Sequence, residues 1–278
     1  MKADEKRIAK GLYWDRALNL VMGCTPFSES CTNCWAAREA HMRAHHPHPE
    51  IRARYEGLTE EGRFNGIIRY NYKPLHAYQR ARKSRVWSVW NDLFHVKVSA
   101  EFINTCFDIF QKSRYHTVIV LTKRIRRAYM LIRDGHVQPV PDNVILGTTV
   151  ELPQYADRIE TLLQIPARTR MVSLEPLLGP VDLHKWLYQQ CKVYWGSGED
   201  DWGYDIEPRE DGISWVVAGC ESGPKRRETK PQWLRYLKNE CVIANVPFFL
   251  KQSNGYINGK SHVVKMPLLD GREWSEFP

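Results

Sequence analysis

The chain has 278 residues, of which 43% are hydrophobic and 12% aromatic, with a net charge of +8 and an isoelectric point of about 9.1. This composition permits a large core and excludes a disordered chain. No stretch approaches the ~18 uninterrupted apolar residues of a membrane span, and the opening MKADEKRIAKGLYW lacks the apolar segment of a secretory signal. We therefore expect a cytoplasmic protein without membrane association, whose seven cysteines bind metal or stay reduced.

Short apolar runs alternate with helix-like segments along the chain. The predicted strands are Ala17–Met22, Arg85–Trp90, His116–Leu121, Asn143–Thr149, Thr169–Leu174, Ser214–Gly219 and Val246–Leu250. The predicted helices are Cys34–His45, Ala100–Ser113, Ile125–Arg133, Pro153–Gln164 and Pro231–Ala244. Several strand runs are continuously apolar, which is typical of parallel strands buried on both faces.

Strands that alternate with helices predict βαβ units and a parallel sheet. Six or seven such units predict an α/β fold of the (β/α) barrel kind, full or partial and TIM-like. A doubly wound sheet is the alternative, although no glycine-rich phosphate loop follows the first strand. We expect a single domain over residues 1–278, with an irregular insertion near 46–84 and a second insertion near 188–212.

Polar side chains follow every predicted strand, at the edge where barrel enzymes build their active sites. In chain order they are Cys24, Asn91, Asp92, Thr122, Lys123, Thr148, Thr149, Glu151, Ser173, Glu175, Cys220, Glu221, Ser222, Lys251 and Gln252. Each alone has a structural explanation, such as a helix cap or a turn. Together they predict one polar pocket at the mouth of the barrel.

Basic residues form three clusters, Arg80–Arg85, Lys123–Arg127 and Lys225–Arg227. Clusters of this kind suit a polyanion such as DNA or RNA. The alternative is that they are solvated helix faces.

Residues 23–35, GCTPFSESCTNCW, carry Cys24, Cys31 and Cys34 in a C-x6-C-x2-C pattern. Structural zinc would add one histidine to the three thiolates, and the nearby candidates are His41, His45, His46 and His48. Unliganded thiols are a second interpretation. The third is an iron–sulfur cluster held by three thiolates, with one iron open to a substrate or cofactor.

Further motifs follow in order along most of the chain: WNDLFH, VLTKR, NVILGTTVE, RMVSLEPLLGP, WVVAGCESGP, PFFLKQ and LDGREW. With them the chain resembles a family of bacterial and phage proteins of unknown function, which carries a three-cysteine motif like that of radical S-adenosylmethionine enzymes. The sequence departs from that pattern in the first cysteine gap, which is six residues rather than three. Trp35 stands where relatives tend to have tyrosine, and Cys220 replaces a glycine of a GGESG-like run.

The resemblance implies a radical-SAM barrel whose three cysteines hold a 4Fe-4S cluster, with S-adenosyl-L-methionine on the open iron. Reductive cleavage of this cofactor would give a 5′-deoxyadenosyl radical that abstracts hydrogen from the substrate. The resemblance also implies cofactor-binding roles for Asn91 and Asp92 (amino group), Lys123 (carboxylate), and Thr149, Glu151 and Glu175 (ribose or substrate). The implied catalytic residues are Cys220, as a substrate-facing thiol or hydrogen donor, Glu221 and Lys251. The alternative for Cys220 is a small core residue.

We therefore expect an enzyme that modifies or repairs a base in DNA or another nucleic acid, or that acts on a nucleotide. The reaction would be a rearrangement in phage thymidine hypermodification, or a repair like that of the radical-SAM lyase that reverses spore DNA photodamage. A flavodoxin-like reducing partner is implied, in the cytoplasm of a bacterium or of a phage-infected host cell. One alternative is a zinc-stabilised nucleic-acid-binding protein without redox chemistry. The other is a barrel that lost its cluster and serves as a scaffold.

Overall fold

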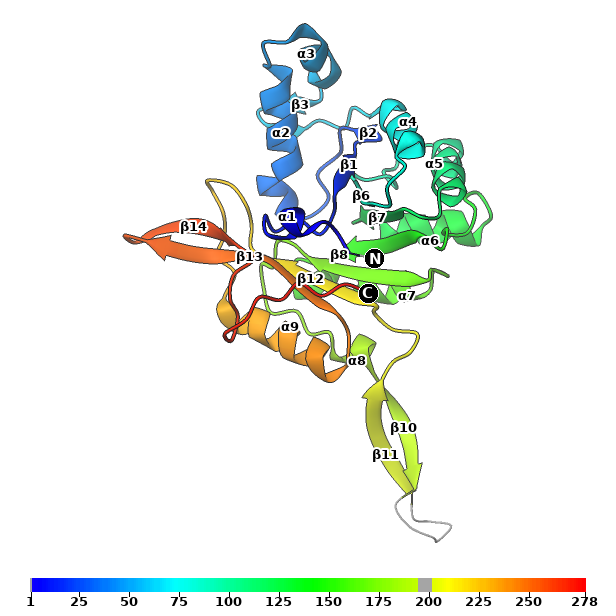
Figure 1. The fold of residues 1–278 in the computed structure, drawn as a ribbon, viewed down its shortest axis with the longest axis vertical. Coiled ribbons are helices and arrows are strands. Elements are labelled where there is room, and N and C mark those ends of the chain that lie inside the picture. The colour runs from blue at the N-terminus through cyan, green and yellow to red at the C-terminus, as the bar shows by residue number, and fades with distance from the viewer. Residues whose placement is uncertain (1, 195–201) are drawn as a thin grey trace.

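The computed structural model describes residues 2–194 and 202–278, and within these residues one large sheet of eight strands organises the fold (Figure 1). In spatial order its strands are β1 (Arg16–Leu18), β6 (Val86–Val89), β7 (Thr117–Thr122), β8 (Val144–Thr149), β9 (Thr169–Leu174), β12 (Trp215–Gly219), β13 (Phe248–Ile257) and β14 (Lys260–Lys265). Neighbours from β1 to β13 pair parallel, and β14 returns antiparallel along β13.

Helices cover one face of this sheet. They are α4 (Lys73–Arg80), α5 (Ala100–Lys112), α6 (Ile125–Arg133), α7 (Asp157–Leu163) and α9 (Pro231–Ile243). The sequence explains α5 directly, because Ser99 Oγ accepts a hydrogen bond from the Phe102 N–H at 3.2 Å and caps the helix. Phe102, Cys106 and Phe110 then recur every four residues and bury one helix face against the strands.

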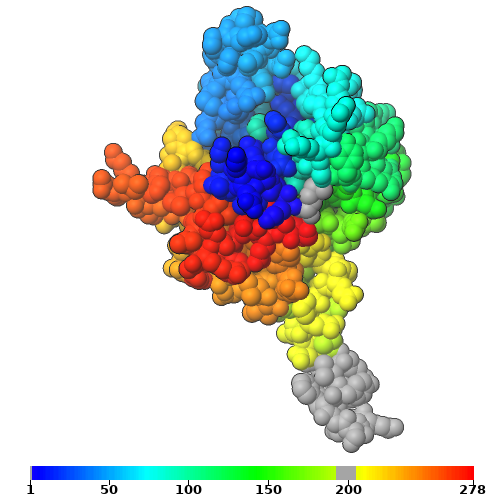
Figure 2. Space-filling view, in the orientation of Figure 1, coloured from blue at the N-terminus to red at the C-terminus, as the bar shows by residue number. Residues whose placement is uncertain are grey.

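The opposite face of the sheet is covered by the two ends of the chain. Alternate strand residues point to this side, and Trp215 and Phe249 pack there with Tyr13 and Trp14 from the N-terminal segment. Phe277 joins them from the C-terminal tail. Figure 2 shows the N-terminal residues in dark blue beside the C-terminal residues in red.

The predicted strands and helices are present, with two differences. The first strand is broken: β1 belongs to the large sheet, whereas β2 (Val21–Met22) pairs antiparallel with β5 (Arg69–Tyr70). The helix predicted at Pro153–Gln164 is divided into a 3₁₀ turn, η2 (Pro153–Tyr155), and α7. A hydrophobic run does not itself show where the chain changes its pairing partner or its helix type.

The fold is mixed α/β with a mostly parallel sheet. No ladder among the described residues joins β1 to β13 or β14, so a closed barrel is not observed. The strands nevertheless lie in chain order without a reversal. A doubly wound sheet reverses its order at a switch point, so that alternative is wrong.

The two predicted insertions contain regular structure. Residues 46–84 are not irregular, because they form α3 (Pro49–Tyr55), β3 (Thr59–Glu60), β4 (Arg63–Phe64), β5 and α4. These elements are short and polar, which explains why hydrophobic periodicity missed them. Residues 188–212 contain the antiparallel strands β10 (Tyr188–Tyr194) and β11 (Trp202–Pro208), while 195–201 lie outside the described residues.

The remaining elements are α1 (Glu5–Ile8), the 3₁₀ helix η1 (Glu29–Asn33), α2 (Trp35–Ala44) and α8 (His184–Leu187). None of the described helices has the length and apolar character needed to cross a bilayer.

Candidate functional site

A cavity of about 250 Å³ opens at the carboxyl ends of the parallel strands. The polar residues that follow the strands converge there, since neighbouring parallel strands all end at one edge of the sheet. Of the residues predicted for the site, the following line the cavity: Cys24, Cys31, Cys34, Asn91, Asp92, Lys123, Thr149, Glu175, Cys220, Glu221 and Lys251. Glu151 is fully buried behind the wall and reaches the cavity through its bond to Lys123.

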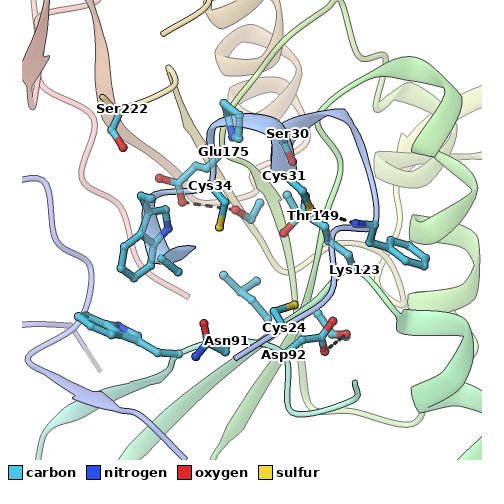
Figure 3. Close-up of a pocket in the computed structure, with 18 of the residues that line it drawn as sticks. Cys24, Ser30, Cys31, Cys34, Asn91, Asp92, Lys123, Thr149, Glu175 and Ser222 are labelled. Carbon is cyan, nitrogen blue, oxygen red and sulfur yellow. Dashed lines mark hydrogen bonds between the residues drawn. The ribbon is translucent and has the colours of Figure 1, made fainter. Parts of the chain in front are cut away.

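The three cysteines approach the cavity from different parts of one loop. Cys24 follows β2, Cys31 lies in η1, and Cys34 is the residue before the first turn of α2. Figure 3 shows their side chains directed into a common space. The six residues between Cys24 and Cys31 include the start of η1. This turn directs the chain back, so that Cys31 lines the same cavity as Cys24.

The nearby histidines do not face the same cavity as the three cysteines. No group of three His, Cys, Asp or Glu side chains in residues 2–194 and 202–278 has metal-binding geometry. The four histidines proposed as a fourth ligand are not among the cavity-lining residues. A tetrahedral zinc site with bonds of about 2.3 Å needs its ligands tightly gathered.

Three thiols that line one cavity are the donor type that holds an iron–sulfur cluster. Positive charge lies beside them, because Arg124 Nη1 is 3.9 Å from Cys24 Sγ and Lys123 lines the same cavity. Such cations offset the charge of coordinating thiolates. The residues present therefore fit a cluster held by three thiolates.

Burial keeps the thiols of Cys24 and Cys34 in the protonated form. Burial raises the pKa of Cys24 to about 12, with Asp92 adding to the effect and Arg124 opposing it. Burial also raises the pKa of Cys34. A metal that bound these thiols would therefore release their protons as it bound.

Asp92 and Arg124 form a buried ion pair beside Cys24. The Asp92 carboxylate accepts hydrogen bonds from Arg124 Nη1 at 2.7 Å and from Thr122 Oγ1 at 2.6 Å. Arg124 also donates to the Thr25 carbonyl at 2.9 Å, so the pair fixes the backbone next to Cys24. The geometry places Asp92 as support for the cysteine loop, with its acceptor oxygens already occupied.

Asn91 has a left-handed backbone with φ of 59°. Its side-chain amide donates to the Val21 carbonyl at 2.6 Å, so Asn91 ties the end of β6 to β2. Figure 3 shows it on the cavity wall near Cys24 and Asp92.

Glu151 anchors the other side of the cysteine loop. It accepts hydrogen bonds from Ser30 at 3.1 Å and from Ser28, and it pairs with Lys123 at 3.1 Å and Arg158 at 3.0 Å. Burial alone would raise the pKa of this carboxyl, but the two cations and the Ser28 hydroxyl lower it below its usual range. The charged Glu151 carboxylate therefore links the cysteine loop to the end of β8.

The loop after β12 closes the cavity from a third direction. Glu221 is buried and accepts from Asn33 Nδ2 at 2.9 Å and from Arg227 Nη2 at 2.5 Å. Its predecessor Cys220 is buried in the wall, where burial raises the pKa of its thiol to about 11. Glu221 thus holds the cysteine loop, while Cys220 presents a neutral thiol.

The floor of the cavity holds a second ion pair, between Lys251 Nζ and Glu175 Oε1 at 2.9 Å. Glu175 also accepts from Tyr13 OH at 2.8 Å. Burial, together with the nearby Glu175 charge, raises the pKa of Tyr13 well above its usual value. Lys251 lies over the Trp14 ring at 5.2 Å, so aromatic side chains shield this charge pair from solvent.

Several cavity residues were not singled out from the sequence, chiefly Tyr13, Trp14, Ser30 and Arg124. Tyr13 and Trp14 precede the first strand. The prediction considered only residues that follow a strand, so it did not include them. Arg124 belongs to the VLTKR motif and to the basic cluster Lys123–Arg127, but neither pattern predicts that it lines the cavity.

Comparison with sequence families matches residues 9–278 to a family described as a protein of unknown function, DUF5131. Comparison with curated proteins and with solved structures found no match. Because the matched region spans nearly the whole chain, including every strand of the sheet and the complete cysteine loop, this protein belongs to the DUF5131 family.

Proposed function

We propose that this protein is a radical S-adenosylmethionine enzyme built on a partial (β/α) barrel. One observation carries the proposal: three cysteines of one loop line a cavity at the carboxyl ends of the ordered parallel strands, and none of the four nearby histidines lines it. This arrangement leaves one side of the metal group open to a small molecule.

Cys24, Cys31 and Cys34 would ligate a 4Fe-4S cluster, and the cavity would hold S-adenosyl-L-methionine against its open side. When bound, these groups would supply reductive cleavage of the cofactor and hydrogen abstraction from the substrate. A flavodoxin-like protein would supply the electron.

The chain's own residues orient and enclose these groups. Asp92, through Arg124, fixes the position of Cys24, and Glu151 and Glu221 hold the rest of the loop. Asn91, Lys123, Thr149 and Glu175 present polar groups to the cavity and would bind the amino, carboxylate and ribose groups of the cofactor.

Cys220 and Lys251 would act on the substrate. The Cys220 thiol lies in the cavity wall in its neutral form, which retains the hydrogen atom that a donor must deliver. Lys251 holds the charge of Glu175 at the cavity floor and excludes water together with Trp14.

The substrate we propose is a base in a nucleic acid. The net charge of +8 favours a polyanion, and Trp35, exposed by 42% at the cavity, offers a ring on which a base can stack. The resemblance to phage proteins favours thymidine hypermodification by rearrangement, with repair of a damaged base as the other reaction type. The enzyme would act in the cytoplasm of a bacterium or of an infected host cell.

Anaerobic reconstitution tests the proposal. The protein should bind about four irons per chain, absorb near 400 nm and release 5′-deoxyadenosine when reduced with S-adenosylmethionine. Alanine at Cys24, Cys31 or Cys34 should abolish all three signals. Cys191→Ala is the matched control, since Cys191 is also half-buried but does not line the cavity.

Other outcomes would favour the alternatives. Stoichiometric zinc without cofactor cleavage would indicate a zinc-stabilised nucleic-acid-binding protein. Function that persists in the triple alanine variant would indicate a scaffold that has lost its cluster.

A further inference from the structure

The three basic clusters of the chain lie at different places in the fold. Arg80–Arg85 comes between the end of α4 and the start of β6, at the edge of the sheet opposite the cavity. Lys123–Arg127 begins at the cavity, but its charges there are neutralised by Glu151 and Asp92. Lys225–Arg227 lies in the loop after β12, directly beyond the cavity-lining residues Glu221 and Ser222.

Arg38 of α2 joins this third cluster. Its guanidinium lies against Gly223, which has φ of +109°, and a methyl group at Gly223 would be 2.1 Å from Arg38 Nη1. Lys225 is fixed through its backbone, since its carbonyl accepts from Asn33 Nδ2 at 2.9 Å. Helix α2 and the loop after β12 thus bring their cations to the same side of the cavity.

We call Arg38, Lys225 and Arg226 the rim of the cavity. Their charges are available for binding. Within the part of the chain that the structure describes, no carboxylate pairs with Arg38, Lys225 or Arg226, whereas Arg227 is neutralised by Glu221. Arg38 and Lys225 are exposed. Arg226 Nη1 donates to the Ser261 carbonyl at 2.7 Å, and its Nε is buried without a partner.

An aromatic ring accompanies these cations. Trp35 lines the cavity three residues before Arg38 on α2, and its ring meets Trp90 edge-on at 5.0 Å. A cationic edge beside an exposed ring is the combination that binds single-stranded nucleic acid, where phosphates contact the cations and bases stack on the aromatic.

We propose that Arg38, Lys225 and Arg226 bind the phosphates of a nucleic-acid strand whose target base stacks on Trp35 and enters the cavity. This inference rests on the proposed function, because it supplies the substrate site for the same cavity. A base inside a duplex cannot reach a cavity below a rim, so the target nucleotide must be unpaired or extruded. The strand would therefore cross over α2 and the loop after β12, where Arg38 lies against Gly223.

Salt-dependent binding of a fluorescein-labelled 20-nucleotide DNA strand tests the proposal by fluorescence anisotropy. Single strands lose about 0.7 in the slope of log affinity against log salt for each phosphate contact removed. The double variant Arg38→Gln, Lys225→Gln should therefore flatten the slope by about 1.4 and weaken binding at least fivefold at 50 mM salt. RNA of the same sequence and a fully paired DNA duplex form the other arms, and we expect the duplex to bind more weakly than either strand.

The matched control is Arg82→Gln, Lys83→Gln, which removes the same charge from exposed residues at the opposite edge of the sheet. It should leave the slope unchanged. Equal weakening by both double variants, or no binding of any strand by the wild-type protein, would overturn the inference. Trp35→Ala should weaken binding about tenfold, with Trp35→Phe restoring most of it.

Iron content measured on the same samples separates this inference from the proposed function. Strand binding that depends on the rim, in a protein that takes up no iron, would support the inference and refute the radical chemistry. Normal iron content without strand binding would refute this inference and leave the radical chemistry supported.

Discussion

Arg124 is a buried cation whose charge is balanced by the carboxylate of Asp92 at 2.7 Å. Replacing Asp92 with asparagine keeps the shape but leaves Arg124 uncompensated. Loss of one partner of a buried ion pair costs about 3–5 kcal/mol. We expect the free energy of unfolding of Asp92→Asn to fall by this amount, measured by urea denaturation.

Asp211→Asn serves as the control for that variant. Asp211 also pairs with an arginine, Arg209 at 3.0 Å, but its side chain is 70% exposed. Exposed ion pairs contribute little. A loss in Asp92→Asn no larger than that in Asp211→Asn would contradict the structural role given to Asp92.

His95 makes the stability of the protein depend on pH. Burial, with help from the nearby Arg124 charge, lowers the pKa of His95 from 6.5 to about 4. The unfolded chain therefore takes up a proton first as pH falls, so this stabilisation is present above pH 6.5 and is lost towards pH 4. The loss between pH 7 and pH 5 should be about 2 kcal/mol.

Urea denaturation at the two pH values checks this expectation. His95→Gln should remove most of the difference, because the amide does not titrate, while the exposed His76→Gln should behave as wild type. A pH dependence that survives in His95→Gln would assign it to other groups.

At the scale of elements, the cysteine loop is held from outside itself. Glu151 binds Ser28 and Ser30, and Glu221 binds Asn33, so carboxylates at the ends of β8 and β12 fix η1. Glu151→Gln would leave Lys123 and Arg158 without a counter-charge and loosen η1. Cys31 and Cys34 should then react severalfold faster with a thiol reagent such as DTNB.

Glu240→Gln is the matched control for the thiol assay. The Glu240 side chain is 16% exposed and pairs with His184 between α9 and α8, and neither residue lines the cavity. Unchanged thiol reactivity in Glu151→Gln would show that the loop keeps its conformation without this anchor.

The elements themselves could be predicted because their signals are local. The apolar run Thr169–Leu174 and the amphipathic segment Ile125–Arg133 agree with β9 and α6 at both ends. The convergence of strand-end polar groups followed from the rule that parallel strands end together. What each group does was not predictable, since the bonds from Asp92 to Arg124 and from Glu221 to Arg227 join residues whose pairing depends on loop conformation.

At the scale of the whole molecule, the chain ends close the face of the sheet opposite the helices. Phe277 packs on Trp215 with ring centroids 5.4 Å apart, and Trp215 Nε1 donates to the Glu276 carbonyl at 2.9 Å. Phe277→Ala should lower the free energy of unfolding by about 1–3 kcal/mol, since Phe277 is partly buried. Tryptophan fluorescence during urea denaturation measures it.

Val96→Ala, at a side chain that is 65% exposed, should leave stability nearly unchanged. A similar result for Phe277→Ala would mean that the C-terminal tail does not contribute to the core.

Whether the edges of the large sheet join into a closed barrel could not be predicted from the sequence. Alternating strands and helices predict a barrel order, and the order is observed, but whether the edges join depends on the summed curvature of the sheet. The packing of Tyr13 and Trp14 beneath the strands was equally hidden, because it joins an N-terminal segment to β12 and β13.

The order of the site's parts along the chain has a consequence for biosynthesis. The cysteines lie near the start of the sequence, whereas Glu221, Arg227 and Lys251 lie near its end. The cysteines therefore emerge from the ribosome before the residues that enclose them have been synthesised. In the proposed enzyme, metal loading must follow completion of translation, and the unfinished chain needs protection of its thiols from oxidation until then.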